Sequence, residues 1–171
     1  MALSMHQASV TVFVHALKNL DALLSKGEAF AASKKIEPSV LLGMRLAADM
    51  RPLTSQVQLA SDNSKGPAGR LAGVERPSFE DNETTFADLH ARIAKTIAFL
   101  ESIDAKKFDG AESRTVTFPV RGDDIKFRGD AYLLYFALPN FFFHITTAYD
   151  ILRHAGVEIG KLDYLGPFRT E

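Results

Sequence analysis

The feature that most constrains this chain is a stripe of apolar residues that recurs every three or four positions between residues 86 and 103. Its members are Phe86, Leu89, Ile93, Ile97, Leu100 and Ile103. Because an α-helix has 3.6 residues per turn, these side chains share one face, and such a helix is stable when that face is buried against other helices. The stripe therefore predicts a helix that packs in a bundle.

Three further helices are predicted from similar patterns, at residues 3–24 with a softer extension, at about 46–62 and at about 130–154. Pro52 and Pro139 lie inside the last two, where each removes a backbone hydrogen bond, so we expect a kink or break at each. Gly156 is the expected C-cap of the last helix. The glycines and proline of residues 64–77 are expected to end the second helix, and His15 is expected to face water.

The segment RTVTFPVRGDDIKFRG breaks the helical period. Val116 and Phe118 alternate with threonines, Ile125 and Phe127 alternate with charged residues, and the letters RGDD between them are typical of a turn. This pattern predicts a small β-hairpin. The expected fold is all-α: a four-helix bundle, formed as a single domain by residues 1–171, with the hairpin between its third and fourth helices.

Charge and cysteine content exclude several functions. The formal net charge is −1 and there is no cysteine. Without a basic field we expect neither a nucleic-acid partner nor binding to a membrane surface. The lack of cysteine removes disulfides, thiolate metal sites and cysteine nucleophiles, and it fits a reducing compartment. No segment approaches the ~20 apolar residues that cross a membrane, and no signal peptide is recognised. We therefore expect a cytoplasmic protein.

Three polar residues interrupt the apolar faces. Asn140 and His144 are one turn apart in the run LPNFFFHITTAYDILRHAG, so they share a helix face. Asp49 flanks the predicted stripe of the second helix, close to its proline. If the two proline kinks face each other, the bundle opens into a pocket with a carboxylate, an amide and an imidazole on its walls. Further lining candidates are Gln56 and His6.

Each of these residues also has a structural interpretation. His144 could be a core histidine whose hydrogen bonds are satisfied within the bundle. Asn140 could cap backbone groups freed by the preceding proline. Asp49 could pair with Arg45 or Arg51 on the same helix. Under this interpretation the residues form a hydrogen-bond network and no cofactor is bound.

The segments LAADMRPLTSQVQLASD and LPNFFFHITTAYDILRHAGVEIGKLDYLG resemble a family of bacterial proteins of unknown function related to the DinB/YfiT-like superfamily of four-helix bundles. The most specific part is AYDILRHAGVEIGKLDYLG. The resemblance implies a divalent metal held by one histidine on the second helix and an H-x3-H pair on the last. These positions fall near Asp49, at Asn140 and at His144. Asp49 would still ligate Zn²⁺, Ni²⁺ or Mn²⁺, whereas an amide oxygen is a poor ligand for Zn²⁺ or Ni²⁺.

Two functions are open at this point. In the first, a degenerate pocket holds a divalent metal that polarises water or a small thiol or carboxylate ligand, with His144 as a ligand, Asp49 as a ligand or base, and Asn140 as an orienting group. In the second, the protein binds no metal and is a small-ligand-binding or assembly module. There the aromatic run Phe141–Phe143 and a C-terminal tail that folds back or reaches a partner chain would form a homodimer. No pattern decides whether the protein is an enzyme.

Overall fold

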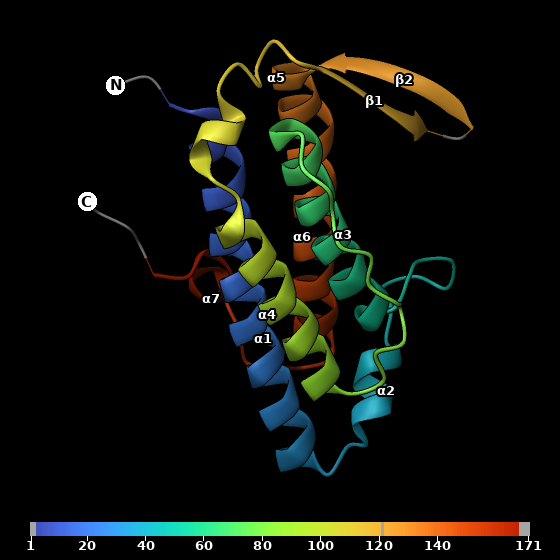
Figure 1. The fold of residues 1–171 in the computed structure, drawn as a ribbon. Coiled ribbons are helices and arrows are strands. Elements are labelled where there is room, and N and C mark those ends of the chain that lie inside the picture. The colour runs from blue at the N-terminus through green and yellow to red at the C-terminus, as the bar shows by residue number, and fades with distance from the viewer. Residues whose placement is uncertain (1–2, 121, 168–171) are drawn as a thin grey trace.

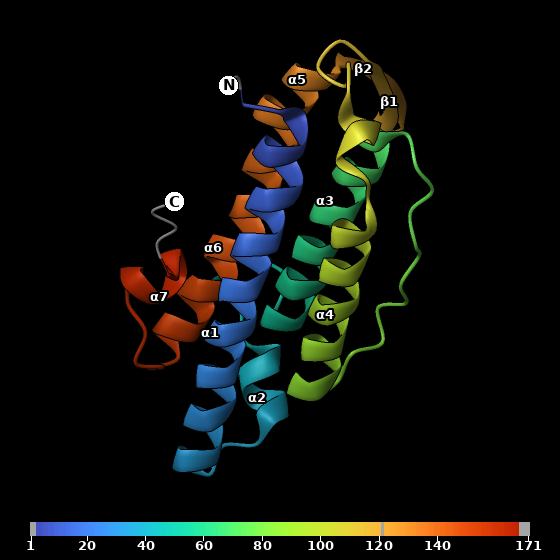
Figure 2. The ribbon, with the colours of Figure 1, turned by 60° about the vertical axis from the view of Figure 1, so that its left-hand side comes forward.

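Four long helices make up most of the fold. The computed structural model describes residues 3–120 and 122–167, and it is mostly helical with one small antiparallel sheet. The long helices are α1 (Val12–Lys34), α3 (Leu53–Ala72), α4 (Phe86–Ser102) and α6 (Leu138–His154). They run side by side, and among these four helices α1 and α3 each pack mainly on α4 and α6 (Figures 1 and 2). Their apolar faces therefore meet in a common core.

Shorter elements connect and flank these helices. They are the π-helical turns η1 (Gln7–Thr11) and η3 (Leu133–Ala137), the 3₁₀ turn η2 (Ala105–Phe108), the short helices α2 (Pro38–Gly43), α5 (Gly129–Tyr132) and α7 (Lys161–Leu165), and the strands β1 (Thr115–Val120) and β2 (Asp123–Arg128). The two strands pair as the predicted hairpin, which confirms that part of the prediction. Arg121 of the predicted turn lies outside the described residues. Within the described part of the chain, no helix could span a lipid bilayer.

The predicted stripe of α4 is confirmed by burial. Phe86, Leu89, Ile93 and Leu100 are all buried, and the helix begins with a capping box in which Thr85 accepts from the backbone of Asp88. Across the core, the rings of Phe13 and Phe141 meet edge to face with their centroids 4.8 Å apart. The helical period thus identified the side chains that face the core.

The second long helix, α3, differs from its prediction at both ends. It begins at Leu53 rather than near residue 46, because Pro52 has no N–H and its fixed φ suits a position at the start of a helix. It also runs through Pro67 to Ala72, where the sequence predicted an end. An internal proline disfavours a helix by about 3 kcal/mol. That loss is offset by the packing of α3 on both α4 and α6, and Gly66, Pro67 and Ala68 are all buried.

Pro139 lies where a π-helical turn passes into the α-helix α6, so the helical run is not uniform at this point. The π-helical turn η3 ends directly before Leu138, and Pro139 is the second residue of α6. The residues before it are helical as well, so Pro139 withholds one backbone N–H from a continuous helical run, and the change from π- to α-helical geometry lies directly beside it. At its other end α6 stops as predicted: Gly156 has φ +98°, and the N–H of Val157 donates to the Leu152 carbonyl oxygen at 3.1 Å. This is the Schellman arrangement.

Two peripheral segments are held onto the long helices by side chains. The C-terminal tail folds back on α1, where His15 Nε2 donates to the Leu165 carbonyl oxygen at 2.9 Å. His15 is therefore half-buried, and the prediction that it faces water is wrong because α7 covers it. At the other end of the molecule Phe118 of β1 packs on Tyr132 and Phe136, with centroids 5.3 and 4.8 Å apart. These rings attach the hairpin to η3.

Candidate functional site

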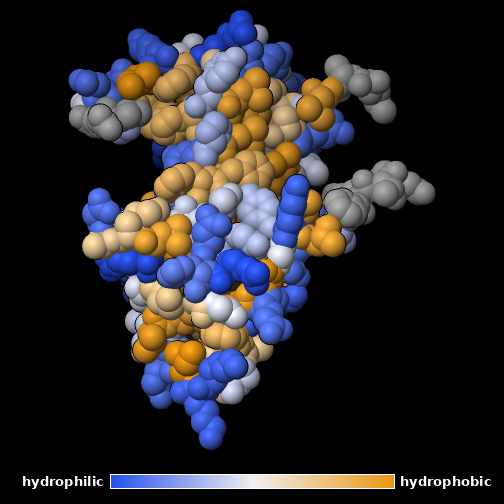
Figure 3. Space-filling view, turned by 180° about the vertical axis from the view of Figure 1, so that it is seen from behind, coloured by the Kyte–Doolittle hydropathy of each residue, from blue (hydrophilic) through white to orange (hydrophobic). Residues whose placement is uncertain are grey.

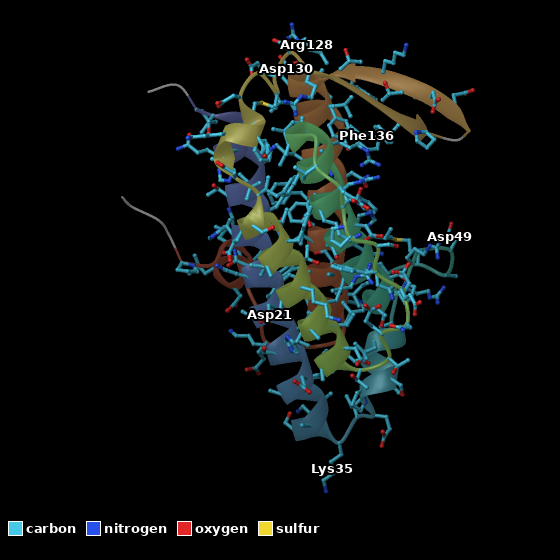
Figure 4. All side chains as sticks on the ribbon, viewed as in Figure 1. Asp21, Lys35, Asp49, Arg128, Asp130 and Phe136 are labelled. Carbon is cyan, nitrogen blue, oxygen red and sulfur yellow. The ribbon has the colours of Figure 1, made fainter. Side chains whose placement is uncertain are left out.

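The first predicted site residue, Asp49, is not on a helix. It lies in an exposed turn of the loop between α2 and α3, which stands out from the long helices (Figure 4). The helical placement of Asp49 is therefore wrong, and the reason is that Pro52 starts α3 only after this turn. Its predicted ion-pair partner Arg45 donates to the Ala48 carbonyl oxygen at 3.4 Å. The Asp49 carboxylate thus faces solvent.

His144 lies on α6 and is buried against α3. Its Nδ1 is 2.8 Å from Oε1 of Gln56, and Nε2 of Gln56 donates to the Arg51 carbonyl oxygen at 2.9 Å. Since the amide nitrogen of Gln56 already serves as a donor to the backbone, its oxygen must accept, and Nδ1 of His144 must carry the hydrogen. In the neutral ring, Nε2 then holds an unshared electron pair.

Burial keeps this imidazole neutral. Removal from water lowers the pKa of His144 below its ordinary value of 6.5. Nε2 has no hydrogen-bond partner among the described residues. Among the described residues, Arg92 Nε is the only side-chain nitrogen or oxygen that is both fully buried and without a hydrogen-bond partner. Nε2 of His144 has no partner either, so it must retain some surface accessible to solvent. Nε2 of His144 can therefore accept a hydrogen bond or bind a cation.

Asn140 faces α3 one turn before His144, as its spacing predicted. Its Nδ2 donates to Oδ1 of Asn63 at 2.7 Å, so it bonds a side chain of α3 rather than capping its own helix. Further along α3, NH1 of Arg70 donates to the hydroxyl of Tyr132 at 3.3 Å. We call these three pairs, which join α3 to α6 and, in the last pair, to α5, the polar seam: Gln56–His144, Asn63–Asn140 and Arg70–Tyr132.

Asn63 and Arg70 are seam residues that the sequence interpretation missed. Gln56, Asn63 and Arg70 follow one another at intervals of seven residues, which is close to two helical turns and places them on one face of α3. That signal is visible in the sequence only if α3 is known to continue through Pro67. Of the two predicted lining residues, Gln56 contacts His144, whereas the ring of His6 packs edge-on against Phe108 of η2 at 5.3 Å.

The donors of the seam are a poor fit to the divalent metal that the family resemblance implies. The seam offers one imidazole nitrogen, and the carboxamides of Asn63 and Asn140 already bond each other. In the described residues, no three side chains drawn from His, Cys, Asp and Glu come together as a metal-binding group. Zn²⁺ and Ni²⁺ prefer imidazole, thiolate and carboxylate donors over amide oxygens. The arrangement suits a ligand that forms hydrogen bonds better than it suits these ions.

Comparison with known proteins agrees with this fold. A crystal structure at 1.83 Å resolution of a DinB family member protein from Shewanella denitrificans has a TM-score of 0.92 and 43% sequence identity, and the match covers 98% of this chain and 94% of that one. The molecule is therefore a DinB-like helical protein. Residues 5–165 match the domain of unknown function DUF1993, and the chain belongs to that family. A search of curated proteins found no match.

The lowered pKa of His144 predicts a pH dependence of folding stability. The unfolded chain takes up a proton at this histidine near pH 6.5, before the folded protein does. The stability due to neutral His144 is therefore complete above that pH and is lost as the pH falls toward the lowered pKa. In urea unfolding below pH 6.5, the wild type should lose stability faster than His144→Gln. Replacement of the exposed His154 by Gln is the matched control. Equal pH slopes for wild type and His144→Gln would contradict the prediction.

Proposed function

We propose that this protein is a four-helix bundle of the DinB type that binds a small polar ligand at the polar seam. The observation that carries the proposal is the oriented neutral imidazole of His144: Gln56 holds Nδ1–H, and Nε2 is left with its electron pair available. An N–H or O–H group of a ligand would donate to this nitrogen. The ring of Phe143, 55% exposed and edge-on to His144 at 5.3 Å, supplies an apolar wall beside it.

Metal binding by Asp49, Asn140 and His144 is the competing proposal. It is favoured by one feature, because a metal-bound histidine usually donates its second N–H to an oxygen, as His144 does to Gln56. The exposed position of Asp49 and the shortage of strong donors count against it. The ions concerned are Zn²⁺, Ni²⁺ and Mn²⁺.

One experiment separates the two proposals. The purified protein is incubated with each ion in turn, desalted and analysed for metal content, together with Asp49→Ala and His144→Ala. We expect no stoichiometric metal in any sample. A bound ion that both variants lose would support the metal site instead.

The ligand itself is tested by NMR on the His144 ring. Small amides and alcohols are titrated while the ¹⁵N signals of His144 and of the exposed His154 are followed. Binding at the seam should shift Nε2 of His144 and leave His154 unchanged, and Gln56→Ala should weaken the response because the ring loses its fixed tautomer. If no probe shifts the His144 signals selectively, the proposal fails.

A homodimer is a second proposal, carried by the exposed apolar side chains of η3 and α6. Leu134, Tyr135 and Phe143 are 54%, 80% and 55% exposed, and hydrophobic surface extends over this side of the molecule (Figure 3). Tyr135, Pro139 and Phe143 recur every four residues, so they form one stripe. A twofold axis can lay this stripe against its copy, and a net charge of −1 gives little repulsion between copies.

Light scattering after size-exclusion chromatography tests the dimer. We expect the wild type to have the mass of two chains and Tyr135→Glu/Phe143→Glu to have the mass of one. Leu162→Glu is the matched control, because Leu162 is 69% exposed but lies on α7. A monomeric wild type at high protein concentration would contradict the proposal.

A further inference from the structure

The last pair of the polar seam, Arg70–Tyr132, lines a cavity of about 400 Å³. It lies between the second half of α3, η3, strand β1 and the segment of residues 76–78 that follows α3. Arg70, Arg76 and Tyr132 supply its main hydrogen-bond donors, and Phe118 and Phe136 form an aromatic wall. A volume of this size is typical of sites for small organic molecules. We call it the arginine cavity.

The two guanidinium groups of this cavity have no carboxylate partner among the described residues. Arg70 stacks over the ring of Phe118, 4.9 Å from its centroid, and donates to the Tyr132 hydroxyl. Arg76 is exposed and forms no hydrogen bond or ion pair within the described chain. The nearby Lys65, by contrast, is neutralised by Asp62 at 2.6 Å. Positive charge is thus concentrated here in a protein whose net charge is −1.

Two glycines of α3 make room for these arginines. A Cβ atom at Gly66 would lie 3.0 Å from NH1 of Arg70 and 3.8 Å from NH1 of Arg76, so both guanidinium groups lie over this glycine. A Cβ at Gly69 would overlap the side-chain carbons of Arg76. Glycine inside a helix is less favourable than alanine by up to about 1 kcal/mol. The close approach of the two arginines explains why glycine occupies both positions.

The proximity of Arg70 also disfavours the charge of Arg76. Although the Arg76 residue is exposed, partial removal of its guanidinium group from water and the positive charge of Arg70 both lower the pKa of Arg76. An anion bound between the two groups would relieve this repulsion and accept charge-assisted hydrogen bonds from both. The Tyr132 hydroxyl accepts from Arg70, and its own hydrogen can be donated to the same anion.

We propose that the arginine cavity binds a small organic anion, whose carboxylate or phosphate oxygens bridge Arg70 and Arg76 and whose apolar part packs against Phe118 and Phe136. Tyr132 donates a further hydrogen bond to the anion. The inference goes beyond the proposed function: it shares the Arg70–Tyr132 pair of the seam, but it does not use His144 or depend on the ligand of that residue.

To test the proposal, the protein is titrated with benzoate, phenyl phosphate and inorganic phosphate. Binding is measured by calorimetry and by changes in the NMR signals of the arginine side chains. Arg76→Gln removes one of the two guanidinium groups that would hold the anion, at an exposed position. The affinity of this variant for the probe that binds should be at least about tenfold lower than that of the wild type, as expected for loss of a charge-assisted hydrogen bond. Gly69→Ala should weaken binding without changing the net charge, because it displaces Arg76. The matched control is Arg153→Gln, which removes the same charge from an exposed position in the last turn of α6.

The probes identify the anion. Preference for benzoate indicates a carboxylate ligand, and preference for the phosphates indicates a phosphorylated one; either supports the proposal if both cavity variants weaken binding and Arg153→Gln does not. Equal effects of Arg76→Gln and Arg153→Gln would mean that net charge alone attracts the probes, and the proposal would be wrong. Absence of saturable binding to all three probes would also overturn it. His144→Ala should bind the probes normally, so the outcome is independent of the His144 experiments.

Discussion

Replacement of Arg92 by Leu is expected to destabilise the protein by roughly 3–5 kcal/mol, the loss typical of removing one member of a buried ion pair. Arg92 lies on α4 and is 2% exposed. Its guanidinium group contacts Glu83 at 2.9 Å, Asp81 at 3.0 Å and Asp62 at 3.1 Å. The side chain of Glu83 is only 8% exposed, so its charge would be left buried with the hydrogen bond from Gln58 but without a cationic partner.

The effect should be large because Arg92 also holds the segment between α3 and α4. NH1 of Arg92 donates to the Glu80 carbonyl oxygen at 3.0 Å. Burial raises the pKa of Glu83, but hydrogen bonds from Arg92 and Gln58 outweigh burial and keep that pKa below its ordinary value of 4.5. The stability from ionised Glu83 is therefore complete above pH 4.5 and is lost as the pH falls through the lowered pKa. The deficit of the variant should shrink in acid.

Urea unfolding of the variants measures this difference. Lys18→Leu is the matched control, since it breaks the pair with Glu101, whose two side chains are 54% and 53% exposed. That change should be worth less than about 1 kcal/mol. Arg92→Lys should fall between wild type and Arg92→Leu, because an ammonium group cannot bond three carboxylates in the same way. Similar losses for Arg92→Leu and Lys18→Leu would show that the buried network contributes little.

Gly129→Ala is expected to destabilise the protein by roughly 2–3 kcal/mol, as overpacking of a closed contact does. Gly129 is the first residue of α5, directly after the hairpin, and it is buried. A Cβ atom there would overlap the backbone carbonyl of Ala111. The N–H of the next residue, Asp130, donates to the Glu112 carbonyl oxygen at 3.1 Å, so the two backbone segments are tied together. The clash therefore requires a backbone shift.

Gly43→Ala provides the control for this substitution. Gly43 is the last residue of α2, is exposed, and has no atom within 4 Å of the position of a Cβ. Here alanine should leave stability unchanged or raise it by about 0.4–1 kcal/mol through the unfolded state. Thermal unfolding compares the two variants, and the amide signals of β1 and β2 report whether the hairpin moves. If Gly129→Ala is as stable as Gly43→Ala, the backbone at Ala111 leaves room for a Cβ atom at position 129 and the prediction is wrong.

The helices whose apolar residues follow a regular period could be predicted from the sequence. The stripe of α4 requires only that Phe86, Leu89 and Ile93 share a face, and the alternation around Phe118 requires only the period of a strand. Gly156 indicates a helix end because glycine, which has no Cβ atom, adopts the positive φ of a C-cap without strain. Each of these features depends on residues that are close in the sequence, so it can be predicted from the sequence alone.

The limits of α3 could not be predicted in this way. Pro52 and Pro67 look alike in the sequence, yet the first starts the helix and the second lies inside it. The difference comes from packing on α4 and α6, which stabilises a stretch that glycine and proline would disfavour in isolation. The same misplacement put Asp49 on a helix when it lies in an exposed turn.

In the candidate site, too, some features follow from the sequence and others only from the tertiary structure. The spacing of Asn140 and His144 by itself determined that they share one face of α6, because an α-helix returns to the same side after four residues. Only the tertiary structure decided what they meet: Asn63 and Gln56 on α3, and beyond them Arg70 beside Arg76. Contacts between distant segments depend on how two helices are rotated and displaced against each other, and no local period in the chain carries that information.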